Sequence, residues 1–317
     1  MKKLLFVYNP HSGKGQIVGK IGTIVEILTK AGYFVTIYPT QRALDGYDIV
    51  CAADGQYDLI VCSGGDGTLN EILSATMTHI HGKTPIGYIP AGSTNDYART
   101  LGLPKNLIKA AEVIAEGNII SCDMGRMNGR YFNYIAAFGL FTEVSYSTPQ
   151  NVKNVLGHQA YILESIKSLT RIKNYNMTVT SNDMTFSGEY IFGMISNTDR
   201  VGGFKGITGR TVDLNDGLFE VTLVKSPKTP IELQQIVAGM FSKSQKSNMI
   251  ERFKTNRILI ESEESITWTL DGENGDAHQR VEITVIENAI RIISNCGKKD
   301  SKAIEDKGSI VEENNEE

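Results

Sequence analysis

Residues Val61–Glu71 read VCSGGDGTLNE, and this stretch decides the fold of the first part of the chain. The apolar run Asp58–Cys62 is typical of a buried strand, and the run after the glycines has its apolar side chains at helical spacing. A glycine-rich turn between a strand and a helix offers free backbone N–H groups at the positive helix end, which suits an anion. The backbone can approach a ligand closely at Gly64, Gly65 and Gly67.

Asp66 stands in the middle of this turn. A carboxylate repels phosphate groups unless a cation lies between them, so Asp66 predicts Mg²⁺ held together with a nucleotide. Thr68 and Glu71 have the spacing of a capping box, which predicts that they fix the start of the helix. The common nucleotide motifs are absent, because Ile21 follows Gly19-Lys20 where Walker A needs Ser or Thr, and Asn70 replaces the last glycine of GxGxxG.

Two further turns have the same setting. NPHSGKG (Asn9–Gly15) follows the apolar strand Lys3–Tyr8, and PAGSTND (Pro90–Asp96) follows the strand Pro85–Ile89. Each turn alone could be a plain loop with routine helix-capping residues. The carboxyl ends of parallel strands share one edge of a sheet, where open α/β sheets bind ligands. The three turns together therefore predict a phosphate site at that edge.

The pattern of the chain changes near Ile119. Before it, strands alternate with helices at 17–30 and 104–117, which predicts parallel βαβ units with helices on both faces. After it, most runs are strand-like, with predicted hairpin turns at Asn128-Gly129, Asn182-Asp183 and Glu287-Asn288 and helices over 155–169 and 231–241. We therefore expect two domains: an α/β domain at 1–122 and an antiparallel, sandwich-like β domain at 123–293.

Composition narrows the class of protein. The 317 residues carry a net charge of −4, which does not suit a general nucleic-acid binder. The four cysteines are scattered without a CxxC pair, which indicates a reduced, cytoplasmic setting. No apolar run approaches the roughly 18 residues of a membrane helix, so any membrane contact is expected to be peripheral. The basic stretch Lys225–Arg257 is either a solvated face or a surface for anionic membrane.

The three turns NPHSGKG, GGDGTLNE and PAGSTND together resemble the diacylglycerol kinase catalytic-domain family of lipid kinases, especially its soluble bacterial members. The resemblance covers nearly the whole chain and includes DMGRMNGRYF (Asp123–Phe132), DLNDGLFEV (Asp213–Val221) and LDGE (Leu270–Glu273). GGDGT by itself is shared with NAD kinases. Ser93 departs from the family, which more often has threonine there, but it keeps the hydroxyl.

The resemblance implies an ATP-binding domain completed by the C-terminal segment 294–317, with a β-rich domain that carries the lipid. Asp271 and Glu273 match the family's acidic pair, one of which takes the proton from the lipid hydroxyl, and the choice between them stays open. A structural Mg²⁺ would lie at the DLNDGL loop, held by Asp216 and by the carbonyl oxygens of Asp213 and Leu218. The residues expected around the nucleotide and its metal are Asn9, Pro10, Ser12, Gly13, Lys14, Thr40, Gly64, Gly65, Asp66, Gly67, Thr68, Asn70, Glu71 and Ser93.

The expected function is an ATP- and Mg²⁺-dependent kinase that converts diacylglycerol into phosphatidate for phospholipid synthesis. It would work in the cytoplasm at the membrane surface, and the resemblance also implies a homodimer. Three alternatives stay open: another lipid acceptor such as a sphingoid base, monoacylglycerol or phosphatidylglycerol; an NAD kinase; and a non-catalytic regulator. A pure binder would not need the acidic pair, which argues against the last.

Overall fold

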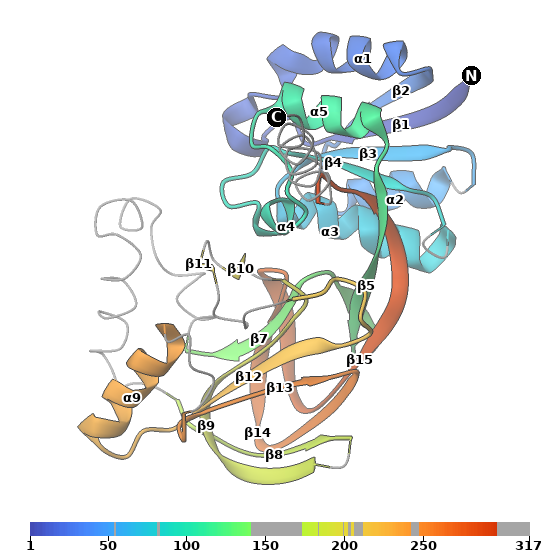
Figure 1. The fold of residues 1–317 in the computed structure, drawn as a ribbon. Helices are drawn as coiled ribbons and strands as arrows, with labels where there is room; N and C mark the ends of the chain where they lie inside the picture. Colours follow the sequence, from blue (N-terminus) through green and yellow to red (C-terminus); the bar gives the residue numbers. More distant parts are fainter. Residues whose placement is uncertain are drawn as a thin grey trace, which may run out of the picture.

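The computed structural model describes residues 1–53, 55–80, 83–140, 173–182, 184–198, 200–201, 204–205, 212–241 and 247–296. An α/β part lies above an antiparallel β part in Figure 1, and one 13-stranded sheet runs through both. The helix expected over 155–169 lies outside the described residues. No helix among the described residues is long and apolar enough to cross a membrane.

The α/β part is built on parallel strands in the order β4-β3-β1-β2. Strands β3 and β4 are buried along their whole length, which explains their unbroken apolar sequences. Helices α1 and α5 cover one face, and α2 and α3 cover the other (Figure 1). The elements are β1 (Lys2–Tyr8), α1 (Ile21–Lys30), β2 (Tyr33–Pro39), α2 (Asp45–Ala52), β3 (Leu59–Gly64), α3 (Asp66–Ala75), β4 (Ile86–Pro90), α4 (Asp96–Thr100) and α5 (Leu107–Glu116).

The helix predicted before Gly117 has both of its expected ends. Asn106 caps α5 by accepting hydrogen bonds from the N–H groups of Ile108 and Lys109, and Gly117 ends it with a φ of 72°. The helix predicted from residue 17 begins later, because a 3₁₀ turn at Val18–Lys20 precedes α1. Helix α2 was not predicted from the sequence.

The antiparallel part encloses a second core. Strands β7 and β8 each pair with both β9 and β14, so the sheet bends round buried aromatic side chains such as Phe138 and Trp268. The expected sandwich-like layers therefore belong to one continuous sheet. The elements are β5 (Ile119–Met127), β6 (Arg130–Phe132), β7 (Ile135–Gly139), β8 (Tyr175–Ser181), β9 (Met184–Ser196), β10 (Arg200–Val201), β11 (Phe204–Lys205), β12 (Phe219–Lys225), α9 (Pro230–Phe241), β13 (Ile250–Thr255), β14 (Arg257–Leu270) and β15 (Glu273–Ile293).

Two of the predicted hairpin turns are present and the third is wrong. Asn128 and Gly129, with φ of 47° and 91°, join β5 to β6, and Asn182 has a φ of 47° between β8 and β9. The pair at 287–288 lies inside β15, at a bulge where the pairing with β5 shifts. The Asn288 N–H donates to Asp123 Oδ1 there, at 2.7 Å. The bulge therefore satisfies a buried carboxylate instead of turning the chain.

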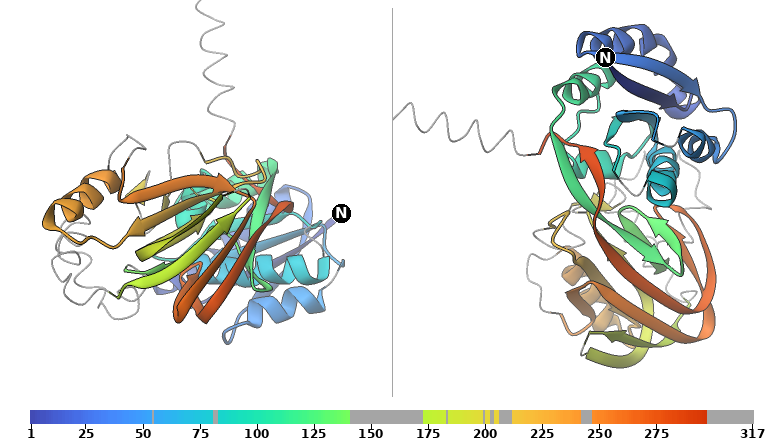
Figure 2. Two further views of the ribbon diagram at one scale, coloured as in Figure 1. Left: turned by 90° about the horizontal axis from the view of Figure 1, so that it is seen from below. Right: turned by 90° about the vertical axis from the view of Figure 1, so that its right-hand side faces the viewer.

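Strand β15 joins the two parts. It pairs with β14 and β5 in the antiparallel part and continues to β4, where Ile292 lies beside Ile86 (Figure 2). The predicted boundary at residue 122 falls within β5, which runs along β15. Residues 297–317 lie outside the described chain. The division into domains at that boundary stays a prediction.

Candidate active site

The three glycine-containing turns lie side by side at the carboxyl ends of β1, β3 and β4. The Asn9 N–H donates to the Ser63 carbonyl at 2.8 Å, which joins the first turn to β3. The N–H groups of Ala91 and Gly92 donate to the Gly64 carbonyl at 2.8 and 3.1 Å, which joins the third turn to the second. The neighbouring positions of these strands therefore bring the turns together, as their sequences predicted.

Glycines allow this close contact. A Cβ atom on Gly13 would lie 2.0 Å from the Ala91 carbonyl oxygen, and one on Gly92 would lie 2.5 Å from the Gly65 Cα atom. Contacts this short exclude any side chain. On the outer side of the turns, Lys14 and Ser93 are exposed.

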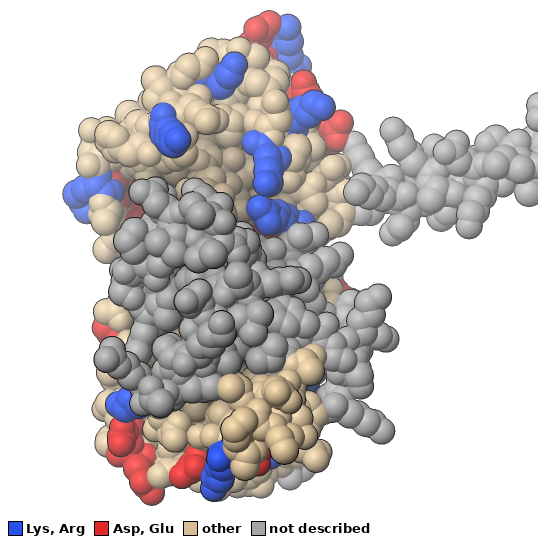
Figure 3. Space-filling model, turned by 90° about the vertical axis from the view of Figure 1, so that its left-hand side faces the viewer, with Lys and Arg blue, Asp and Glu red and all other residues tan. Residues whose placement is uncertain are grey.

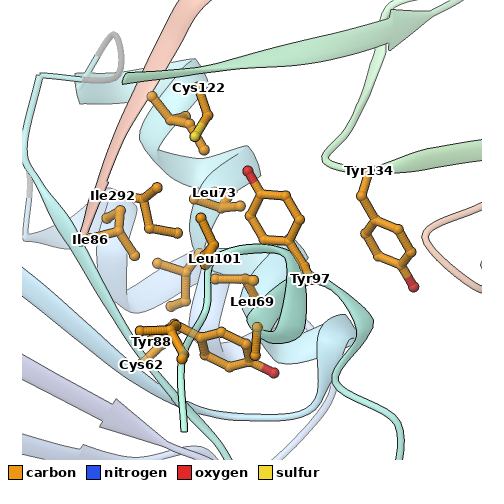
Figure 4. Close-up of a cluster of buried hydrophobic side chains, with 14 of the residues drawn as sticks. Cys62, Leu69, Leu73, Ile86, Tyr88, Tyr97, Leu101, Cys122, Tyr134 and Ile292 are labelled. Atoms are coloured by element: carbon orange, nitrogen blue, oxygen red, sulfur yellow. The ribbon is translucent and has the colours of Figure 1, made fainter. Parts of the chain in front are cut away.

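Tyr88 and Asn95 hold the third turn in shape. The Tyr88 hydroxyl lies 3.2 Å from both the Gly64 carbonyl oxygen and Asn95 Oδ1. Asn95 Oδ1 accepts from the Gly92 N–H, and its Nδ2 donates to the Gly92 carbonyl. Figure 4 shows the Tyr88 ring among the buried side chains of this region. Sequence analysis missed Tyr88, whose position inside an apolar strand gave no signal of this role.

Asp66 points towards the start of α4. Its Oδ2 accepts from the Asp96 N–H at 3.4 Å, while its Oδ1 is buried without a hydrogen-bond partner in the described part of the chain. Burial, and next the neighbouring Asp96 carboxylate, raises the pKa of Asp66 to about 6. A buried carboxylate oxygen without a donor suits a divalent cation such as Mg²⁺. The predicted metal role of Asp66 thus fits its surroundings.

Asp271 accepts hydrogen bonds from the backbone of a neighbouring segment. Its Oδ2 accepts from the Asn133 N–H at 2.6 Å, and its Oδ1 accepts from the N–H groups of Tyr134 and Ile135 at 2.9 and 3.0 Å. Burial raises the pKa of Asp271 to about 7, although these three donors favour the charged form. Figure 4 shows Tyr134 beside Tyr97 of α4, and their stacked rings have centroids 6.1 Å apart. Asp271 therefore fixes the segment that packs on α4.

Glu273 is the member of the acidic pair that lies against the turn at Gly64–Gly67, which we call the phosphate turn after the ligand predicted for it. It is exposed at the start of β15, and a Cβ atom added to Gly67 would lie only 2.8 Å from its Oε1 atom. The tight β14–β15 hairpin, in which Asp271 and Gly272 have φ of 52° and 85°, holds it there. The antiparallel part thus places a carboxylate against the turn of the α/β part, and this carboxylate has no ion-pair partner among the described residues.

Several expected nucleotide residues have other roles. Glu71 accepts from the N–H groups of Leu44 and Gly46, so it caps the start of α2. Helix α3 begins at Asp66 with Gly65 as its cap, which makes the predicted capping box wrong. Thr40 is buried and donates its N–H to the Tyr8 carbonyl, and Asn70 accepts from the Ser74 hydroxyl. The cited contacts of these residues are structural, and their predicted place around the nucleotide stays a prediction.

The acidic side chains of the DLNDGL loop are held by contacts within the protein. Asp216 Oδ2 pairs with Lys254 Nζ at 2.8 Å, and its Oδ1 accepts from the Leu218 N–H at 3.0 Å. Asp213 accepts from the Asn215 N–H at 3.4 Å. No group of three or more His, Cys, Asp or Glu side chains among the described residues could hold an ion. An ion on Asp216 would have to compete with Lys254 for the carboxylate. A site that combines this carboxylate with the carbonyl oxygens of Asp213 and Leu218 stays a prediction.

The described residues of the basic stretch are mostly neutralised. Lys225 pairs with Glu251 at 2.9 Å, Lys228 lies 3.8 Å from Glu189, and Lys254 bridges two acids. Lys243 and Lys246 lie outside the described residues. On the face in Figure 3, acidic and basic side chains lie together over the antiparallel part. These pairs favour an ordinary solvated face and remove Lys254 as a free membrane contact.

The chain is similar in sequence to a known family of proteins. The family model "Diacylglycerol kinase catalytic domain" matches residues 3–127, which include all three turns. The chain is 31% identical over 277 residues to a diacylglycerol kinase of Bacillus subtilis, covering 87% of this chain and 91% of that protein. The chain belongs to the diacylglycerol kinase family. A diacylglycerol kinase of Staphylococcus carnosus is 33% identical, covering 86% of this chain and 89% of its own length.

Solved structures agree with membership of the diacylglycerol kinase family. A putative diacylglycerol kinase from Bacillus anthracis superposes with a TM-score of 0.79 at 26% identity, covering 93% of this chain and 96% of that chain. An NAD kinase from Archaeoglobus fulgidus in complex with ATP gives a TM-score of 0.53 at 14% identity, covering 94% and 96%. The second likeness shows a shared fold alone.

Proposed function

We propose that the chain transfers the γ-phosphoryl group of ATP to the free hydroxyl of diacylglycerol, which gives phosphatidate. One observation carries the proposal: the free carboxylate of Glu273 lies against Gly67 in the phosphate turn. A hydroxyl bound beside both groups would meet a proton acceptor and a phosphoryl donor at once. Membership of the diacylglycerol kinase family supports the lipid acceptor.

The nucleotide would lie along the three turns. Their backbone N–H groups and the positive starts of the helices attract its phosphates, and exposed Lys14 supplies a point charge. Asp66 Oδ1 would hold Mg²⁺, which supplies charge neutralisation on the phosphates when it is bound. Phosphoryl transfer needs mainly positioning and charge neutralisation, so these groups suffice for the donor side.

The two members of the acidic pair have different roles towards the lipid acceptor. Glu273 accepts the proton of the attacking hydroxyl, because its carboxylate is exposed next to the turn. Asp271 is a positioning residue, because its oxygens already accept three backbone N–H groups. The geometry thus supports Glu273 as the base, a choice that the sequence left open.

Two matched substitutions test this division. Glu273→Gln should lower kcat by about 100- to 10,000-fold, the usual contribution of a general base, with little change in KM for ATP or in Tm. Asp271→Asn should lower Tm, because an amide nitrogen cannot accept the N–H groups that the carboxylate accepts. Full turnover by Glu273→Gln, with a fully folded and inactive Asp271→Asn, would reverse the roles.

Phosphatidate is a phospholipid precursor, so the proposed reaction returns diacylglycerol to phospholipid synthesis. The enzyme would collect its lipid from a membrane surface as a peripheral protein. The Mg²⁺ requirement and the homodimer implied by the family resemblance belong to the same proposal. Equilibrium sedimentation of the full chain checks the dimer directly.

A further inference from the structure

A row of polar side chains lies on one face of the antiparallel sheet. Ser196 is in β9, and Glu220 and Thr222 are in the neighbouring strand β12. Glu220 lies opposite Ser196, and Thr222 lies opposite Met194, so all three side chains point to the same face. We call Ser196, Glu220 and Thr222 the polar row.

The polar row is buried without the usual hydrogen bonds. Ser196, Thr222 and Glu220 are only 0%, 1% and 5% exposed. Their Oγ, Oγ1 and Oε2 atoms have no hydrogen-bond partner in the described part of the chain. A buried polar atom without a partner costs about 1–3 kcal/mol. Alanine and valine would avoid this cost, so the hydroxyls call for a partner that the described part of the chain does not supply.

The polar row has basic residues on one side and apolar residues on the other. On β13, Arg252 lies opposite Thr222 and Lys254 lies opposite Glu220. Met194 and Val224 share its face and belong to the core cluster that also includes Ala137 and, from α9, Ile236. The other face of β12 packs into the second core. Glu220 Oε1 lies 3.1 Å from Lys254 Nζ, which balances its charge. A few hydrogen-bonding groups inside an apolar surface suit a ligand that is itself mainly apolar with a few polar acceptors.

The polar row begins close to the proposed catalytic groups. Ser196 lies opposite Ile135 of β7, whose N–H donates to Asp271 Oδ1 at 3.0 Å. Neighbouring strands are about 4.8 Å apart and a strand rises about 3.4 Å per residue, so Thr222, at the far end of the row, lies about 12 Å from Ile135. Next to it, the Thr198 hydroxyl lies 2.6 Å from the Thr100 hydroxyl of α4, which follows the third turn. The ester groups of a diacylglycerol lie only a few bonds from its free hydroxyl, so one molecule could reach both places.

We propose that the Ser196 and Thr222 hydroxyls donate hydrogen bonds to the ester carbonyls of the acceptor lipid and so select diacylglycerol over lipids without esters. This inference rests on the proposed function and adds a specificity site to it. An ester carbonyl can only accept a hydrogen bond, and an unpaired hydroxyl can donate one to it. The hydroxyls are shielded from water in the lipid-free chain, so entry of the acceptor has to open this region.

The test compares a diester with a diether acceptor. The rates kcat/KM are measured with dioctanoylglycerol and with its dialkyl ether analogue, which lacks both carbonyls, for the full-length chain and for Ser196→Ala, Thr222→Val and the double variant. For the unsubstituted chain, kcat/KM should be at least about tenfold higher with the diester, which corresponds to the free energy of one good hydrogen bond. The preference should fall towards one in the double variant, through KM. The Tm of the double variant should stay the same or rise, because no hydrogen bond within the protein is lost.

Ser181→Ala is the matched control. Its hydroxyl is equally buried but donates to Thr255 Oγ1 at 2.8 Å, so its loss should lower Tm and leave the diester preference intact. An unchanged diester preference in the double variant would overturn the inference. If its Tm also fell, the two hydroxyls would be paired with structural water instead. Failure of the unsubstituted chain to phosphorylate any lipid would overturn the proposed function instead, and the inference with it.

Discussion

The buried and half-buried carboxylates of this chain differ in the number of backbone N–H groups that donate hydrogen bonds to them, and this difference separates their roles. Asp271 accepts three backbone N–H groups, Glu71 accepts two, and Asp66 keeps one buried oxygen free. A carboxylate saturated with backbone donors stabilises local structure, and one without donors stays available for a cation. The sequence alone could not separate them, since the partners of Glu71 and Asp271 lie 27 and up to 138 residues away.

The free oxygen of Asp66 should cost stability in the metal-free protein. Its pKa is raised to about 6 from 3.8, so the folded chain holds this proton more tightly than the unfolded chain. Folding stability should therefore fall as pH rises through that interval, and Asp66→Asn should recover it above pH 6. We expect a gain of about 1–2 kcal/mol at pH 8 that vanishes near pH 4.

Denaturant unfolding in EDTA at both pH values measures this effect. Exposed Glu112→Gln on α5 is the control and should change little at either pH. Asp66→Asn should also lose phosphoryl transfer. A variant less stable than the unsubstituted chain at pH 8 would contradict the account of Asp66 as a carboxylate that awaits a cation.

Among the elements, the parallel strands carried the most information in the sequence. Three strand–turn–helix units had to place their turns at one sheet edge, and the chain has them there. The capping box at Thr68–Glu71 was wrong because side-chain spacing does not show which helix start a carboxylate serves. The turn at Glu287-Asn288 was wrong because a bulge uses the same residues as a hairpin.

The contact between the second and third turns should be sensitive to one methyl group. Gly92→Ala would place a Cβ atom 2.5 Å from the Gly65 Cα atom and force the two turns apart. We expect KM for ATP to rise about tenfold or more, because the backbone N–H groups no longer converge on the phosphates. Nucleotide binding is measured by isothermal titration calorimetry beside steady-state kinetics.

Gly22→Ala on α1 is the matched control for this substitution, since nothing lies within 4 Å of its added Cβ atom. It should leave KM unchanged and stabilise its helix slightly. Equal nucleotide affinity in both variants would show that the turns do not bind the phosphates together.

At the scale of the whole molecule, strand β15 makes one folding unit of the two parts. It begins with Glu273 over the phosphate turn and ends beside β4 in the parallel sheet. The sequence showed the two kinds of structure but not this link, because the strand reads as two separate apolar runs. Glu273 and the turn at Gly64–Gly67 are therefore linked through one continuous sheet.

Ile292→Ala should weaken both parts together. The side chain is fully buried where β15 meets β4, and such truncations cost about 2–5 kcal/mol. Hydrogen exchange should speed up in β3 and β4 as well as in β14. Ile258→Ala, buried in the second core, is the comparison. Loss of protection confined to β4 in the first variant would show that the two parts unfold independently.

Phosphate transfer from labelled ATP with Mg²⁺ to a panel of acceptors tests the central claim most directly. The panel holds diacylglycerol in mixed micelles, a sphingoid base, monoacylglycerol, phosphatidylglycerol and NAD, with Glu273→Gln as the inactive control. We predict label in phosphatidate, lost in the Glu273→Gln variant. Label in NADP alone, or no turnover despite ATP binding, would contradict the account.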